Sequence, residues 1–393
     1  MEPRSLARCT GRQCRSACEG SALLECQVKR GLCSADPLCL LSGGVCMQVP
    51  SLIPRRVRQA SLLRVSNAGI PKGCLGGMEA RFAGGVCLLL MAIGTSACTG
   101  VISPPPVPKI YVADESNNRI VRMDDMTGAG WTPFGTSGSG PNQFRFPSGI
   151  FVSAAGQIFV TDALNHRIVR MDNMTGAGWI TLGGPPAGSG MSQFNAPFGI
   201  FVSAGQIYVA DTSNHRIVRM DTMTGTGWTT LGGPPAGNGP NQFNSPTGIF
   251  VSAGQIYVAD WNNNRIVRMN DMAGTGWTAF GTHGSGMNQF DGPFGVSVSA
   301  GQIYVADRNN NRIVRMNDMT GVGWTEFGTF GNGPNQFSSP FGIFAGAGQI
   351  FVVDTFNSRI VRMDDMTGAG WTPFGTSGSG PNQFNLPVRV FLQ

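Results

Sequence analysis

Short apolar runs that alternate with polar residues recur along the chain from residue 109 onward. The run at residues 205–211 reads Gly-Gln-Ile-Tyr-Val-Ala-Asp, and a polar turn separates it from Arg-Ile-Val-Arg-Met at residues 216–220. Alternating runs bounded by Gly, Asn and Ser are typical of β-strands joined in hairpins. No window shows apolar residues at helical spacing over the length that a helix needs. The pattern therefore predicts an all-β fold.

The aspartate that ends this run recurs every 47 to 49 residues, at Asp114, Asp162, Asp211, Asp260, Asp307 and Asp354. A fixed period of this size indicates repeated supersecondary units. Each unit contains four strand-like runs, which in the second full copy lie at residues 199–203, 206–210, 216–221 and 227–231. Four short strands per repeat are typical of a β-propeller blade, so six copies predict a six-bladed β-propeller with four-stranded antiparallel blades.

The two ends of the repeat array are complementary. The first copy begins at residue 109 without the Gly-Ile-Phe-Val run, and the last copy is followed by one extra apolar run at residues 386–392. We expect this C-terminal strand to become the inner strand of the blade whose other three strands come from the N-terminal end. Such a closure leaves no open sheet edge to promote aggregation.

The repeats resemble those of the NHL-repeat family of β-propellers. The resemblance rests on Pro-x-Gly-Ile-x-Val and on Ile-Tyr-Val-Ala-Asp-x-x-Asn-His-Arg-Ile, and it covers residues 109–393. It implies a six-bladed propeller. The family includes lyases, RNA binders, receptor sensor domains and scaffolds, so the fold alone leaves the function open.

Charge and cysteine divide the chain into two parts. From residue 99 onward there are 1 Lys and 15 Arg against 17 Asp and Glu, and all 10 cysteines lie at or before Cys98. A nearly neutral propeller lacks the basic surface that binding to phosphate backbones requires. We therefore expect no nucleic-acid partner.

Residues 78–97 have the pattern of a secretory signal peptide. Arg81 precedes an apolar run at residues 82–93, and small residues lead to Cys98. Thr-Ser-Ala-Cys at residues 95–98 resembles a bacterial lipoprotein cleavage site, at which Cys98 would be lipidated; ordinary cleavage after Ala97 is the alternative. Residues 98–108, with three consecutive prolines, would form a stiff linker.

Because a signal peptide begins a chain, we expect Met78 to be the true start and residues 1–77 to be an upstream or disordered segment. The alternative is a disulfide-bonded domain, since eight of the cysteines lie in this segment. Such a domain would precede the signal for its own export, which favours the first interpretation.

The Asp-x-x-Asn-x-Arg turn recurs in every blade. A ring of carboxylates could hold a metal ion, but Asp and Asn side chains also close turns by hydrogen bonding to the turn itself. A residue that is repeated in all blades is expected to stabilise the blade itself. We therefore expect a structural role for this turn, no metal site and no cofactor.

The chain has only three histidines, His166, His215 and His283. His166 and His215 occupy a turn position that other blades fill with Asn or Ser, which indicates a tolerated turn residue. The chain shows neither a Gly-x-Ser-x-Gly nor a His-Glu-x-x-His motif. We therefore assign no catalytic residue; the alternative is a lyase or hydrolase that acts at the channel mouth with His166 or His215.

Positions that differ between blades are the candidate binding residues. They lie after the turn Asp and between the Pro and Gly that precede each inner strand, and both sets should rim one mouth of the central channel. Aromatic and Arg side chains are typical interface anchors. We predict a binding face made of Trp261, Arg308, Phe356, Phe198, Phe294 and Phe341. The alternative is random drift among exposed loop residues.

These observations predict an exported, envelope-anchored propeller that binds a protein or a small ligand at one face without catalysis. Contact with the membrane would be through the lipid anchor alone.

The assignment of Met78 as the start predicts that the mature native protein contains no peptide from residues 1–77. Mass spectrometry of the purified native protein measures this directly, and a peptide from that segment would contradict the assignment.

Overall fold

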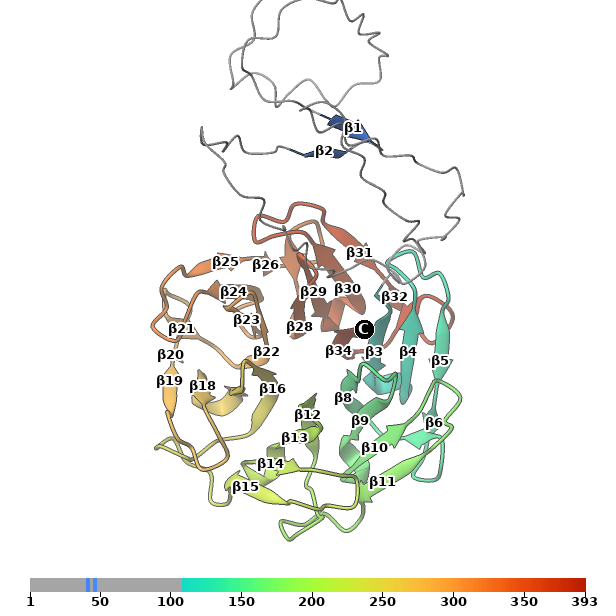
Figure 1. The fold of residues 1–393 in the computed structure, drawn as a ribbon, viewed down its shortest axis with the longest axis vertical. Coiled ribbons are helices and arrows are strands. Elements are labelled where there is room, and N and C mark those ends of the chain that lie inside the picture. Colours follow the sequence, from blue (N-terminus) through green and yellow to red (C-terminus); the bar gives the residue numbers. More distant parts are fainter. Residues whose placement is uncertain (1–39, 43–44, 48–107) are drawn as a thin grey trace, which may run out of the picture. The chain divides into compact units, whose positions relative to one another are not determined.

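The computed structural model of the chain describes residues 40–42, 45–47 and 108–393. Residues 109–393 contain six four-stranded antiparallel sheets arranged around a common axis (Figure 1). This confirms the predicted six-bladed β-propeller. The described residues include no helix with the length and apolar character needed to cross a membrane.

Each blade is a four-stranded sheet whose strands follow one another from the axis outward. From inner to outer strand, blade 1 contains β8 (Pro147–Val152), β9 (Ile158–Asp162), β10 (Arg167–Met171) and β11 (Ile180–Gly183). In the same order, blade 2 contains β12 (Pro197–Ser203), β13 (Gln206–Asp211), β14 (Arg216–Met220) and β15 (Thr229–Gly232). Blade 3 contains β16 (Pro246–Ser252), β17 (Gln255–Asp260), β18 (Arg265–Met269) and β19 (Thr278–Phe280). Blade 4 contains β22 (Pro293–Ser299), β23 (Gln302–Asp307), β24 (Arg312–Met316) and β25 (Thr325–Phe327). Blade 5 contains β28 (Pro340–Gly346), β29 (Gln349–Asp354), β30 (Arg359–Met363) and β31 (Thr372–Phe374). Blade 6 contains β34 (Pro387–Leu392), β3 (Ile110–Asp114), β4 (Arg119–Met123) and β5 (Thr132–Phe134).

Shorter elements connect these strands. Single 3₁₀ turns join the second and third strands of five blades: η1 (Glu115–Asn117), η2 (Ala163–Asn165), η3 (Thr212–Asn214), η4 (Trp261–Asn263) and η5 (Thr355–Asn357). Four of the connections between blades contain a two-stranded parallel pair: β6 (Thr136–Ser137) with β7 (Gln143–Phe144), β20 (Thr282–His283) with β21 (Gln289–Phe290), β26 (Thr329–Phe330) with β27 (Gln336–Phe337), and β32 (Thr376–Ser377) with β33 (Gln383–Phe384).

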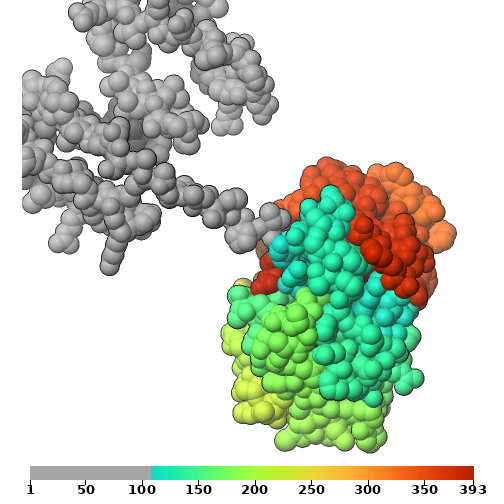
Figure 2. Space-filling model, turned by 90° about the vertical axis from the view of Figure 1, so that its right-hand side faces the viewer, coloured from blue at the N-terminus to red at the C-terminus, as the bar shows by residue number. Residues whose placement is uncertain are grey.

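The C-terminal strand closes the ring. β34 pairs with β3 in antiparallel register, with Val390 opposite Val112 and Arg389 opposite Ala113. Figure 2 shows the first and last segments of the propeller lying side by side, in blue-green and red. The predicted closure is therefore confirmed.

Several predictions concern the part of the chain before the propeller. The segment 1–77, the signal segment 78–97, Cys98 and almost all of the linker 98–108 lie outside the described residues. Two short strands are described there, β1 (Leu40–Ser42) and β2 (Val45–Met47), which pair in antiparallel register.

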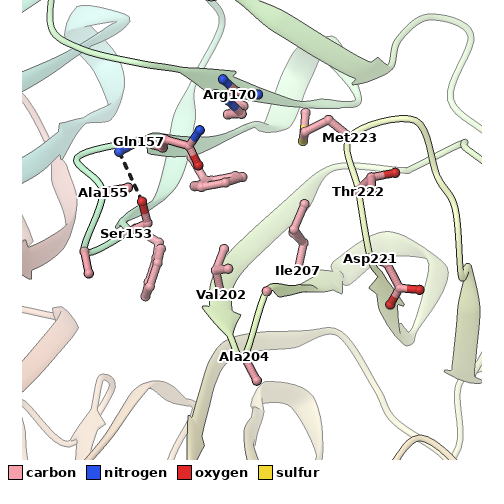
Figure 3. Close-up of a pocket in the computed structure, with 14 residues that line it drawn as sticks. Ser153, Ala155, Gln157, Arg170, Val202, Ala204, Ile207, Asp221, Thr222 and Met223 are labelled. Atoms are coloured by element: carbon pink, nitrogen blue, oxygen red, sulfur yellow. Dashed lines mark hydrogen bonds between the residues drawn. The ribbon is translucent and has the colours of Figure 1, made fainter.

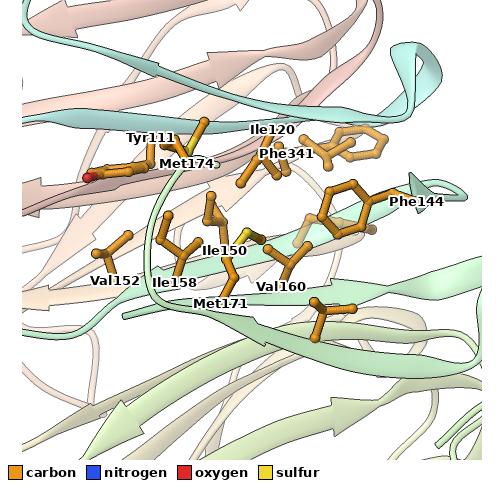
Figure 4. Packing of buried hydrophobic residues seen from close by; sticks show 14 residues of the cluster. Tyr111, Ile120, Phe144, Ile150, Val152, Ile158, Val160, Met171, Met174 and Phe341 are labelled. Atoms are coloured by element: carbon orange, nitrogen blue, oxygen red, sulfur yellow. The ribbon is translucent and has the colours of Figure 1, made fainter. Parts of the chain in front are cut away.

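The hydrophobic core lies between neighbouring blades. Figure 4 shows the cluster between blades 6 and 1, where Tyr111 and Ile120 meet Ile150, Ile158 and Val160. Six half-buried tryptophans, each directly before the outer strand of its blade, lie at the outer side of these interfaces: Trp131, Trp179, Trp228, Trp277, Trp324 and Trp371. Each stacks, at 5.2–5.3 Å between ring centroids, on a fully buried phenylalanine from the connection that enters its blade: Phe144, Phe194, Phe243, Phe290, Phe337 and Phe384.

The turn Asp of each blade is fully buried and organises the turn. In blade 2, Asp211 Oδ2 accepts hydrogen bonds from Asn214 Nδ2 at 2.8 Å and Arg216 Nε at 2.7 Å. Its Oδ1 accepts from the backbone N–H of Asn195, at 2.7 Å, in the connection that enters the blade. Arg216 also donates to carbonyls of that connection and lies 5.7 Å from the Trp228 ring. The other blades repeat this arrangement, which confirms the structural role predicted for the motif.

Asp211→Ala should destabilise the propeller by roughly 3–5 kcal/mol, because it leaves the buried Arg216 guanidinium without its carboxylate. Chemical denaturation measures the free energy of unfolding. Asp221→Ala is the control, since the Asp221 side chain is 45% exposed and its loss should cost less than about 0.5 kcal/mol. Equal effects of the two substitutions would contradict the role given to the buried carboxylate.

Candidate functional site

The turns and the starts of the inner strands meet at one mouth of the central channel. Phe198 of blade 2 and Phe294 of blade 4 stack edge to face at 4.9 Å between ring centroids. Blades 2 and 4 are not neighbours in the ring, so these side chains meet across the propeller axis. Phe341 of blade 5 packs on Phe294 at 4.4 Å. Aromatic rings from three blades therefore cover the channel at this end.

The Arg308 guanidinium packs against aromatic rings at this mouth. Its Cζ atom is 4.3 Å from the ring centroid of Phe341, 5.3 Å from that of Trp261 and 5.5 Å from that of Phe294. Cation–π contacts of this kind hold a guanidinium in place without using its hydrogen-bond donors. Within residues 108–393, Arg308 Nε is buried and has no hydrogen-bond partner.

All six residues predicted for the binding face lie together, and we call them the mouth cluster. Phe356 joins the other five through Phe341, at 6.3 Å between ring centroids. Their exposure differs: Phe356 is 56% exposed, Trp261, Arg308 and Phe198 are partly exposed, and Phe294 and Phe341 are buried. The sequence interpretation placed all six on the surface; the two buried phenylalanines instead support the others from below, because the rings pack on one another at the axis.

Glu115 is a residue of this mouth that the sequence analysis did not select. It occupies the same turn position in blade 6 as Arg308 does in blade 4, and its Oε1 accepts a hydrogen bond from Ser148 Oγ at 3.2 Å. Burial raises the pKa of the Glu115 carboxyl to about 7, although the Ser148 hydrogen bond and the charge of Arg308 oppose the shift. Burial lowers the pKa of Arg308, and the charge of Glu115 opposes that shift. The signal in the sequence was the charge at a position that varies between blades.

The two turn histidines have structural hydrogen bonds. His166 and His215 end their 3₁₀ turns in the left-handed conformation, and their Nδ1 atoms accept from the backbone N–H groups of Ala196 and Ser245, both at 3.1 Å. Asn118 does the same through its Oδ1 atom. The interpretation as tolerated turn residues is confirmed. Residues 108–393 show no group of acidic, His or Cys side chains able to hold a metal ion.

A pocket of about 560 Å³ lies between blades 1 and 2, at the hairpins that join the first two strands of each blade (Figure 3). Its walls are mainly apolar, with Gln157, Arg170 and Asp221 among the polar residues. Its volume falls in the range typical of small-molecule sites. The blade 1 hairpin, Ser-Ala-Ala-Gly-Gln at residues 153–157, is one residue longer than its counterparts in blades 2 to 5. Both alanines of this longer hairpin, Ala154 and Ala155, line the pocket.

Comparison with protein families confirms the repeat type. Residues 194–220, 243–269 and 290–316 match the family described as NHL repeat. Each segment runs from the buried phenylalanine before the inner strand to the end of the third strand. The chain therefore contains NHL repeats, as its residue pattern predicts. No curated protein matches the sequence.

Solved structures share the fold at low sequence identity. A chain in the crystal structure of a nidogen/laminin complex matches with a TM-score of 0.55 and 17% identity, covering 72% of this chain and 98% of that one. Virginiamycin B lyase from Staphylococcus aureus matches with a TM-score of 0.43 and 23% identity, covering 62% of this chain and 73% of that one. The first of these similarities supports the propeller fold and nothing beyond it.

The raised pKa of Glu115 predicts a pH-dependent stability. A carboxyl with a higher pKa in the folded chain binds its proton more tightly there, so its contribution is complete below the ordinary value of 4.5 and is lost as the pH rises toward 7. A shift of this size corresponds to about 3 kcal/mol. Glu115→Gln should remove this loss of stability. Thermal denaturation measures this: the difference in Tm between pH 4.5 and pH 8 should be smaller for the variant than for the unmodified chain.

The matched control is Glu326→Gln, since Glu326 is the other glutamate of the propeller and its side chain is 53% exposed. This variant should keep the loss of stability that Glu115 causes between pH 4.5 and 7. A profile that Glu115→Gln leaves unchanged would contradict the burial of this carboxyl.

Proposed function

Because the chain is a six-bladed propeller in which blades 2 to 4 match NHL repeats, we propose that it is a non-catalytic binding module whose ligand docks on the mouth cluster. The observation that carries this proposal is the Arg308 guanidinium, which is held by three aromatic rings. A fixed guanidinium forms hydrogen bonds with little loss of side-chain entropy. The exposed Phe356 and the partly exposed Trp261 lie around it and supply apolar contact area.

The chemistry of this site favours a protein partner with an acidic group at its centre. Arg and aromatic residues dominate the binding energy of protein interfaces when they cluster near the interface centre. Guanidinium groups pair with carboxylates in a bidentate geometry. Arg308 is partly buried, so water competes less for its donors. Such a pair therefore contributes more to the free energy of binding than a fully exposed one.

We also propose that the chain is exported and anchored in the envelope through Cys98, with cleavage after Ala97 to a secreted form as the alternative. The support is the apolar run at residues 82–93 followed by small residues and a cysteine.

A second candidate function, ligand turnover at the channel mouth, would depend on Glu115 and not on the histidines. A carboxyl with a pKa of about 7 beside an arginine is suited to general acid–base catalysis near neutral pH. The Nδ1 atoms of His166 and His215 already accept hydrogen bonds in their turns. Glu115→Gln would abolish turnover in this case and would leave ligand binding intact.

Affinity capture from envelope extracts tests the binding function. The full-length chain is the bait, beside a variant with Trp261→Ala, Arg308→Ala and Phe356→Ala. We expect to capture a partner whose affinity for the variant is lower by about 30-fold or more. Removing an anchor worth about 2 kcal/mol has an effect of this size. Arg308→Lys should lose most of the binding as well, because an ammonium group lacks the planar shape for stacking and bidentate pairing.

Leu164→Ala is the matched control. Leu164 lies at the same turn position in blade 1 as Phe356 does in blade 5, it is 41% exposed, and it is not part of the mouth cluster. Equal capture by the triple variant would place the binding site elsewhere. Capture of no partner by the unmodified chain would refute protein binding and favour a small ligand or turnover.

A further inference from the structure

The pocket between blades 1 and 2 lies at the opposite end of the strands from the mouth cluster. In blade 1, β9 begins at Ile158, next to the hairpin that lines the pocket, and ends at Asp162, whose turn lies at the mouth. A strand of five residues spans roughly 16 Å. The pocket is therefore a separate site, and no residue of the mouth cluster lines it.

Blade 1 differs from the other blades at two places in this pocket. Its hairpin, residues 153–157, is one residue longer than the hairpins of blades 2 to 5. Phe159 also stands where blades 2, 3 and 4 have tyrosine, opposite the arginine of the third strand. Blade 5 has a phenylalanine there too, Phe351, but it has the shorter hairpin. Among the five blades with this hairpin, blade 1 alone combines the longer hairpin with the loss of the tyrosine hydroxyl.

The loss of that hydroxyl leaves the side chain of Gln157 open to the pocket. In blades 2 to 4 the tyrosine hydroxyl donates to Oε1 of the glutamine two residues before it, at 2.8–3.0 Å: Tyr208 to Gln206, Tyr257 to Gln255 and Tyr304 to Gln302. Among residues 108–393, the hydrogen bonds of Gln157 use its backbone alone, with Ser153 as the partner. The Gln157 amide thus offers a carbonyl oxygen and an NH₂ group at the pocket wall (Figure 3).

The apolar part of the wall is aromatic and is held in place by its neighbours. Phe151 and Phe159 are buried and lie 6.4 Å apart between ring centroids. Phe151 also packs on Phe391 at 4.7 Å and on Phe201 at 4.9 Å. Met223 lines the pocket from blade 2 and supplies a thioether, a group that packs well on aromatic rings. These contacts preform a wall that suits a flat aromatic ligand.

The charged groups of the wall have partners of opposite sign beside them. Arg170 forms an ion pair with Asp172, and Asp221 lies 3.8 Å from Arg219. An ionic ligand would lose part of its hydration in the pocket and would find no unpaired charge among the residues that line it. The wall therefore favours an uncharged ligand.

We propose that the pocket between blades 1 and 2 binds an uncharged aromatic molecule that carries one hydrogen-bonding group, such as an amide, a hydroxyl or an N–H. The ring system packs on Phe151 and Phe159, and the polar group pairs with the Gln157 amide. The volume of about 560 Å³ is sufficient for a drug-sized molecule. Binding here does not depend on a protein partner at the mouth cluster, because the two sites share no residue.

Fluorescence titration of the full chain with N-phenyl-1-naphthylamine tests this proposal. This probe is uncharged, carries one N–H group and emits strongly only in apolar surroundings. We expect saturable binding of one molecule per chain. The probe 8-anilinonaphthalene-1-sulfonate has the same ring system with an added negative charge, and its affinity should be lower by about 10-fold or more.

Two variants locate the bound probe. Deletion of Ala155 combined with Phe159→Tyr gives blade 1 the hairpin length and the tyrosine of blade 2. This variant should fold, because blades 2 to 4 have the same pattern, and it should abolish saturable binding. Gln157→Leu keeps the size of the side chain without its hydrogen bond, and it should lower the affinity by about 5- to 10-fold.

Gln349→Leu is the matched control. Gln349 holds the position of Gln157 in blade 5 and is not among the residues that line the pocket. The affinity of this variant for the probe should equal that of the unmodified chain. Thermal denaturation of all variants shows whether each is folded.

Crystals soaked with 6-bromo-2-naphthol, an uncharged ring system with one hydroxyl, give an independent measurement. We expect an anomalous bromine peak between blades 1 and 2, with the naphthol hydroxyl within hydrogen-bond distance of the Gln157 amide. Absence of saturable binding, a peak at the mouth cluster instead, or unchanged affinity in both pocket variants would overturn the proposal. Equal affinity for the sulfonated probe would overturn the assignment of an uncharged ligand.

Discussion

A buried carboxylate at the end of the second strand of every blade holds this propeller together. One oxygen of Asp211 fastens the turn through Asn214 and Arg216, and the other accepts the backbone N–H of Asn195 in the connection from the preceding blade. The buried Asp–Arg pair is stable because these hydrogen bonds use both carboxylate oxygens. Each turn is thereby fixed to the chain that enters its blade, so all six turns have the same position relative to the axis.

This constraint frees the neighbouring positions to vary. The residue after the turn Asp is Glu115 in blade 6, Trp261 in blade 3 and Arg308 in blade 4. The hydrogen bonds of the turn do not use these side chains, so their chemistry can change without loss of the fold. The ring then brings them to one mouth, where the guanidinium of Arg308 lies 5.3 Å from the ring centroid of Trp261 although the two residues are 47 positions apart. Small differences between near-identical repeats thus become one composite site.

The closing blade has a different role from the five others. Its inner strand comes from the opposite end of the chain and does not follow the repeat pattern, which places Arg389 where the other blades have glycine. Two arginines consequently lie close to the axis, Arg308 stacked on rings at the mouth and Arg389 inside the channel. Glu115 lies at the mouth with Arg308, and the charge of each opposes the pKa shift of the other.

The sequence by itself determined the number of blades, the strand order, the closure and the role of the turn Asp and histidines, since alternation and turn chemistry act over a few residues. It also indicated that Trp261, Arg308 and Phe356 share a mouth. Only the tertiary structure decided that Phe294 and Phe341 are buried and that Glu115 shares the mouth with Arg308. These properties depend on which side chains of distant blades meet across the channel, and no local pattern encodes those distances.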